Sequence, residues 1–170
     1  MTESPIDALN IYFDNKLDMI HTLIPGRIEK YYGHDQRKAE VKPVIKTKTH
    51  EGIVIETPSI DNVPVIFPGS KLFSFLYPIK KGDGCLIGFC ESSIGNFLDG
   101  QSISEPEDLS RFSLTDAICI PGLWSFKGVP SDTKASIEIT EDGLKIKFGD
   151  CLFESDGSKT TINGNFEVDV

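Results

Sequence analysis

The sequence predicts a mainly β protein with three parts: an N-terminal helix (residues 1–24), a small antiparallel barrel (25–130) and a short C-terminal strand tail (131–170). Three observations predict this division. Apolar residues recur at helical spacing near the N-terminus, short apolar runs separated by turn residues fill the centre, and strictly alternating strands form the tail. The length of 170 residues fits one main domain with room for a small extra module.

The charge balance excludes several classes of partner. Seventeen Lys and Arg residues against 26 Asp and Glu residues give a net charge of −9, which disfavours non-specific binding to nucleic acid and to anionic membranes. No apolar run reaches the roughly 18–20 residues of a membrane-spanning helix, and the N-terminus lacks the pattern of a secretory signal. We therefore expect a soluble chain that is synthesised in the cytoplasm and binds no nucleic acid.

The first predicted element is a helix that begins after Ser4. Ser4 and Pro5 form an N-cap and first-turn pair, and Pro25-Gly26 should end the helix. One face carries apolar residues, and we expect this face to pack on the chain's own core, with a partner protein as the alternative. The residues that recur on it every three or four positions are Ile6, Leu9, Phe13, Leu17 and Ile20.

Short strands with frequent turn signals are expected in the centre of the chain. Residues 27–32 and 37–48 flank a polar turn, and residues 72–77 form a further strand. Because proline cannot donate to a sheet ladder, Pro43 suggests an edge position or a bulge. The run 85–90 is apolar on both faces and should be a central strand. Turns spaced about 8–12 residues apart favour a small OB-like antiparallel barrel.

The tail predicts an oligomer. Short alternating strands are expected at residues 136–140, 144–148, 160–162 and 165–170, separated by turns that include Asp-Gly and Asn-Gly pairs. So few two-faced strands cannot bury their own apolar side. We predict that three chains wind their strands around one axis as a trimeric β-prism or β-helix. The alternative is a hairpin extension that packs back on the barrel. The predicted trimer interface consists of Leu144, Ile146, Phe148, Ile162, Phe166 and Val168.

No catalytic, cofactor-binding or metal-binding residues are predicted, and we expect no enzyme. The sequence lacks a G-x-S-x-G motif, a phosphate-binding loop and metal-ligand spacing. Glu105, Glu107 and Asp108 are interpreted as a solvated acidic loop, and the lysines within residues 42–48 as protection of a sheet edge. Reduced, buried thiols are expected at Cys85, Cys90, Cys119 and Cys151.

The centre of the chain also resembles the central-spike proteins of contractile phage tails. The order and the spacing of several motifs agree over about residues 20–124. These motifs are HTLIPGRI (21–28), VKPVI (41–45), VPVIFPG (63–69), KGD (81–83) and DAICIPGL (116–123).

The resemblance implies a virion structural protein of the tail baseplate. In that family an N-terminal OB-fold domain sits under the baseplate hub, and a trimeric C-terminal β-helix forms a needle that sheath contraction drives into the host envelope. The implied partners are two further copies, the hub protein and, transiently, the envelope. Phe97 and Phe112 stand where relatives have tryptophan and histidine, and no histidine follows His50, so the iron site of the needle tip is absent. The short tail implies a stub capped by a separate tip protein, or a domain of a longer chain.

The residue patterns and the resemblance together predict a trimeric central spike, or the stub of one, in the contractile tail of a phage or a phage-derived device. This spike helps to breach the host envelope when the tail contracts. The alternative is an OB-type binding module for nucleic acid or oligosaccharide, which the charge of −9 disfavours. A cell-wall hydrolase is a third possibility, but no segment is left over to form a hydrolase domain.

Overall fold

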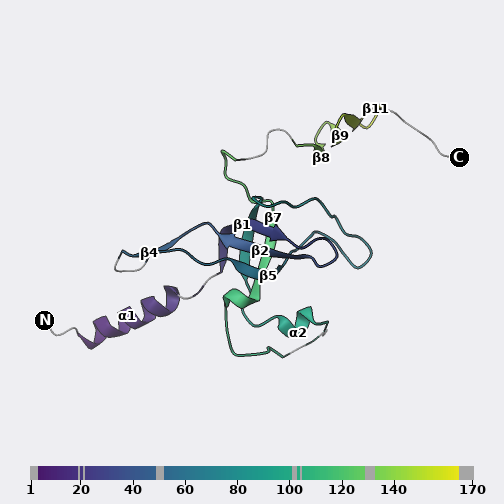
Figure 1. The fold of residues 1–170 in the computed structure, drawn as a ribbon. Helices are drawn as coiled ribbons and strands as arrows, with labels where there is room; N and C mark the ends of the chain where they lie inside the picture. The colour runs from purple at the N-terminus through teal and green to yellow at the C-terminus, as the bar shows by residue number, and fades with distance from the viewer. Residues whose placement is uncertain are drawn as a thin grey trace. The chain divides into compact units, whose positions relative to one another are not determined.

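The computed structural model of the chain describes residues 4–18, 20, 22–48, 52–100, 103, 105–128 and 133–164. The chain divides into two compact units, Met1–Ser125 and Phe126–Val170. The first unit carries a short N-terminal helix and a curled antiparallel sheet, and the second a four-stranded sheet (Figure 1). The predicted mainly β class is confirmed.

Helix α1 (Pro5–Asp18) begins with the predicted cap. The Ser4 hydroxyl accepts the backbone N–H groups of Ile6 (3.2 Å) and Asp7 (3.4 Å), and the Ser4 N–H donates to the Asp7 carboxylate (3.1 Å). This reciprocal pair satisfies amide groups that a helix N-terminus leaves unpaired. The apolar face predicted to pack on the core is exposed. The exposed fractions are 69% for Ile6, 53% for Leu9, 55% for Phe13, 64% for Leu17 and 46% for Ile20.

The helix ends earlier than the Pro25-Gly26 pair suggests. Leu23 and Ile24, which the prediction placed with the helix, already belong to strand β1 (Leu23–Tyr31). They pair with Gly88 and Ile87 of the neighbouring strand, so sheet pairing rather than the proline decides where extended structure begins.

The main sheet of the first unit is a curled antiparallel half-barrel, as expected for an OB-like domain. Its strand order is β5-β2-β1-β6-β7, with β1 at the centre. The two ends of the sheet approach each other at a parallel bridge between Val65 and Cys119, where the Ile66 N–H donates to the Cys119 carbonyl (2.8 Å). The other strands are β2 (Lys38–Pro43), β5 (Ile60–Pro64), β6 (Gly84–Phe89) and β7 (Ala117–Pro121).

The hydrophobic core fills the inside of this curl. Ile28 of β1 and Ile87 of β6 are fully buried, and β6 lies between β1 and β7, as predicted for the run 85–90. The buried hydrophobic residues are Ile28, Ala39, Val41, Val63, Val65, Cys85, Ile87, Phe89, Ala117 and Cys119.

The four cysteines are free and differ in burial. Cys85 and Cys119 are buried as predicted, and the hydrogen bond that the Cys119 thiol donates to Cys85, together with burial, raises the pKa of the Cys119 thiol. Cys90 is half-buried, and burial raises its pKa. Cys151, predicted to be buried, is exposed because it lies on a sheet face that no other described element of the second unit covers.

Of two strand predictions in the first unit, the one at Pro43 agrees with a register shift in β2 between Ala39 and Val41, and the one at residues 72–77 is wrong. Pro43 lies at the end of the internal strand β2, beyond the last pair that joins β2 to β5, so its missing N–H removes no ladder bond there. Residues 72–77 carry an isolated bridge between Gly69 and Ser74 instead of a strand. A tight turn, in which the Ser70 N–H donates to the Phe73 carbonyl (2.6 Å), bends this segment away from a ladder.

A two-stranded hairpin, a short helix and a 3-10 turn connect the strands of the main sheet. No helix in the described residues is long and apolar enough to cross a membrane. The connecting elements are β3 (Thr47–Lys48) and β4 (Val54–Ile55), which pair with each other, helix α2 (Gly95–Leu98) and the 3-10 turn η1 (Leu114–Asp116).

Asp116 anchors the connection between β6 and β7. Its side chain is 5% exposed, and its carboxylate accepts the Ile94 N–H (3.0 Å) and the Thr115 hydroxyl (3.3 Å). Asp116→Ala is expected to lower the free energy of unfolding by about 1–3 kcal/mol because it leaves these donors unpaired. Asp116→Asn keeps an acceptor and serves as the control in urea unfolding. Equal stability of the alanine and asparagine variants would contradict this role.

The second unit is an antiparallel meander. Its strand order is β11-β10-β9-β8. Strand β10 was not among the predicted strands, and the strand predicted at residues 165–170 lies outside the described residues. The four strands are β8 (Ala135–Thr140), β9 (Gly143–Phe148), β10 (Cys151–Ser155) and β11 (Thr160–Asn163).

Candidate interaction site

The pairing register of the meander gathers its apolar side chains on one face. Ile137 pairs with Ile146, Ile146 with Phe153, and Phe153 with Ile162. Directly opposed residues of antiparallel strands point to the same side of the sheet, and so do residues two positions apart. We call the resulting surface the apolar face; it consists of Ile137, Ile139, Leu144, Ile146, Phe148, Cys151, Phe153 and Ile162.

No other element described in the second unit covers the apolar face. Phe148 is 75% exposed, Ile139 is 81% exposed, and Ile137 and Ile162 are each 51% exposed. In an antiparallel sheet with one apolar and one polar face, the apolar face normally packs against another layer of structure. A contiguous exposed apolar patch of this kind marks an interaction surface.

The sequence prediction located most of this face. Leu144, Ile146, Phe148 and Ile162 come together as predicted, whereas Phe166 and Val168 lie outside the described residues. The role of these residues in a trimer stays a prediction. The prediction missed four members of the face, although period-2 alternation was a usable signal in strand β8. These members are Ile137, Ile139, Cys151 and Phe153.

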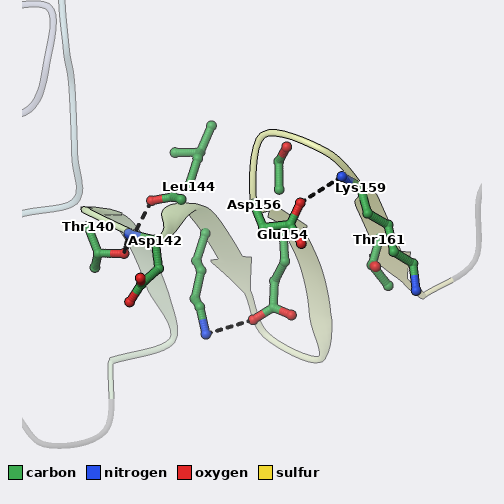
Figure 2. A pocket seen from close by; sticks show the side chains of 10 residues that line it. Thr140, Asp142, Leu144, Glu154, Asp156, Lys159 and Thr161 are labelled. Carbon is green, nitrogen blue, oxygen red and sulfur yellow. Dashed lines mark hydrogen bonds and ion pairs between the residues drawn. The ribbon is translucent and has the colours of Figure 1, made fainter.

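The opposite face of the meander is polar and internally paired. Lys145 of β9 bonds Glu154 of β10 (2.9 Å), and this hydrogen-bonded pair raises the pKa of Lys145. Figure 2 shows a shallow hollow beside this pair, lined by the turns at Asp142 and Asp156. The Asp156 carboxylate accepts the backbone N–H of Lys159 (2.6 Å), and such bonds lower the pKa of Asp156. The Lys145–Glu154 pair and the bond from Lys159 to Asp156 thus satisfy charged groups on this face, and the second bond holds the turn at Asp156 in place.

The close approach of two turns makes Gly143 sensitive to substitution. Its φ is +151°, and a Cβ atom would collide with the backbone carbonyl of Ser155. Gly143→Ala is therefore expected to raise hydrogen-exchange rates across β9 and β10. Gly149→Ala is the matched control, because a Cβ at Gly149 (φ +59°) meets nothing within 4 Å. Equal exchange in the two variants would show that the contact with Ser155 is unimportant.

The other residues considered at the sequence level do not form a reactive cluster. Glu105, Glu107 and Asp108 are exposed, as expected for a solvated loop. His34 is exposed and lies 2.9 Å from the Tyr31 hydroxyl. In the described part of the chain no group of three or more His, Cys, Asp or Glu side chains is placed to hold a metal ion.

Comparison with known families identifies the first unit. The family described as "Phage protein Gp138 N-terminal domain" matches residues 24–122. The chain belongs to this family. The curated proteins give no match.

The match to the Gp138 family covers the half-barrel from β1 to β7 and leaves the C-terminal meander outside. Family membership supports the coarser part of the predicted resemblance, a phage-related structural role. The open apolar face thus belongs to a segment that follows a Gp138-type domain along the chain.

Proposed function

We propose that the chain is a trimeric central spike, or spike stub, of a contractile tail baseplate, and that it helps to breach the host envelope when the sheath contracts. The observation that carries the proposal is the open apolar face of a meander that follows a phage Gp138 domain. The role is mechanical: the trimer transmits force and needs no reaction centre.

Self-association best explains how the apolar face is buried. Exposed apolar area is stabilised by burial at roughly 25 cal/mol per Å², and other copies of the same face supply a surface of matching character. Three meanders with their apolar faces toward one axis bury Ile137, Ile146 and Phe148 of every copy, while the polar face with Lys145 and Glu154 stays in water. Closed cyclic symmetry is the rule for such assemblies.

The dimensions favour a stub. Four strands spaced 4.7–4.9 Å apart span only about 15 Å, whereas the hydrocarbon core of a bilayer is about 30 Å thick. We propose that a separate tip protein caps the trimer and that the half-barrel docks on the baseplate hub. The phage family of the half-barrel supports its placement in a virion.

Electron microscopy of tail particles labelled with Fab fragments against the chain tests the baseplate assignment. The expected result is label at the centre of the baseplate. Label on the capsid or along the sheath, or particles that carry no label while the free chain binds the Fab, would overturn the assignment.

A further inference from the structure

A basic groove lies at the base of the β3–β4 hairpin, outside the apolar face. It is lined by Arg27, Lys42 and Lys46 with a single carboxylate, Glu56, and by the apolar side chains of Val44 and Ile45. Lys46 bonds Glu56 at 2.7 Å, and Lys42 lies 4.0 Å from the same carboxylate. Glu29, which bonds Lys81 at 2.9 Å, also lies near Arg27 and Lys42. With Glu29 and Lys81 included, the cations around the groove still outnumber the carboxylates, in a chain whose net charge is −9.

The rim of the basic groove is apolar and open. Val44 is 47% exposed and Ile45 is 59% exposed, and on the hairpin Val54 and Ile55 are 58% and 51% exposed. The β3–β4 ribbon has two residue pairs, and a ribbon this short is marginally stable in water without a covering layer. The groove and its rim therefore suit a segment that is both acidic and apolar.

The connection between β6 and β7 contains such a segment, residues 105–109, which we call the acidic segment. Asn96 fixes its backbone by donating to the Glu105 carbonyl (3.0 Å), and Asp108 accepts the Ser110 N–H (2.7 Å). Leu109 is 97% exposed. Within the described residues, no hydrogen bond or ion pair engages the carboxylates of Glu105 and Glu107. The segment thus presents Glu105 and Leu109 to solvent from an anchored backbone. Glu107 is also exposed, but its carboxylate lies against Gly95 of α2 and must turn away from it to reach a partner.

We propose that the acidic segment of one copy docks in the basic groove of a second copy. Glu105 and Glu107 face the cations Arg27, Lys42 and Lys46, and Leu109 covers the apolar rim. Both surfaces are exposed on the same half-barrel, so a neighbouring copy can join them, and in the proposed trimer this head-to-tail contact is repeated around a threefold axis, which closes the ring. Opposed charges steer the docking and select its register. The inference rests on the proposed trimer and assigns the contact between its half-barrels.

Zero-length carbodiimide cross-linking of the full chain tests this contact, because the reagent joins lysines to carboxylates that touch. The expected products in the dimer and trimer bands link Lys42 or Lys46 to Glu105 or Glu107. The intrachain Lys145–Glu154 pair is the positive control, since it should couple in every band. Dimer and trimer bands without the predicted links, or the same links in the monomer band, would overturn the inference.

Charge reversal supplies an independent test. Lys42→Glu with Lys46→Glu, and Glu105→Lys with Glu107→Lys, are each expected to raise the concentration at which the oligomer dissociates by roughly tenfold or more, and all four changes together should restore it. Lys71→Glu with Lys80→Glu changes the charge equally outside the groove and should have little effect. A native trimer indifferent to the reversals overturns this inference alone, whereas a native chain that is monomeric at every concentration overturns the proposed function as well.

Discussion

Phe148→Asp in the full chain is expected to convert a trimer of about 56 kDa, three times 18.8 kDa, into monomers. Phe148 is 75% exposed on the apolar face of a single chain, and in the proposed trimer it is buried near the axis. The substitution would bring three carboxylates together without partners, and an unpaired buried charge is strongly unfavourable. Sedimentation equilibrium measures the change in mass directly.

Thr161→Asp is the matched control for this experiment. It adds the same carboxylate to the same meander, but Thr161 pairs with Glu154 on the polar face. This variant should stay trimeric. If Phe148→Asp remained trimeric, or if both variants dissociated alike, the apolar face would not be the trimer interface.

Ile87→Ala is expected to destabilise the half-barrel by about 2–5 kcal/mol. Ile87 is fully buried in the internal strand β6, and its side chain fills the space over Gly26, where an added Cβ would lie 2.7 Å from Ile87 Cγ1. Truncation removes contacts and leaves a cavity that a curled, hydrogen-bonded sheet cannot close. The loss is large compared with a typical domain stability of about 5–15 kcal/mol.

Urea unfolding followed by far-ultraviolet circular dichroism measures this loss. Ile120→Ala is the control: the same substitution on the neighbouring strand β7, at a side chain that is 39% exposed. It should cost much less than Ile87→Ala. Equal losses would show that the core is not organised around β6.

Local sequence signals predicted those elements for which the local pattern and the tertiary contacts favour the same structure. The cap at Ser4 is a contact between residues three positions apart. The apolar run 85–90 forms β6, an internal strand between β1 and β7, and its side chains Cys85, Ile87 and Phe89 lie in the core. In the tail, alternation placed Leu144, Ile146 and Phe148 on one face, since a strand has a period of two.

The failures arise where tertiary contacts decide the outcome. Strand β1 begins at Leu23 because β6 offers it a partner, which no local signal reports. Residues 72–77 have strand-like composition but bend at the turn between Ser70 and Phe73. Strand β10 (Cys151–Ser155) is too short and too weakly alternating to be recognised alone, and it is held between β9 and β11.

The candidate site was predictable to the extent that it depends on periodicity. Alternation identifies which side chains share a face, but the register that places Phe153 beside Ile146 and Ile162 depends on the turns and on pairing between strands. The basic groove was missed for a related reason: Arg27 and Lys46 are distant in sequence and meet because β1 pairs with β2.

The solution mass of the unmodified full chain, measured by light scattering across micromolar concentrations, is the most direct test of the proposed trimer. The expected result is a trimer of about 56 kDa, three times the chain mass of 18.8 kDa. A mass of 18.8 kDa at every concentration would contradict it, and the half-barrel would then be better explained as an OB-type binding module.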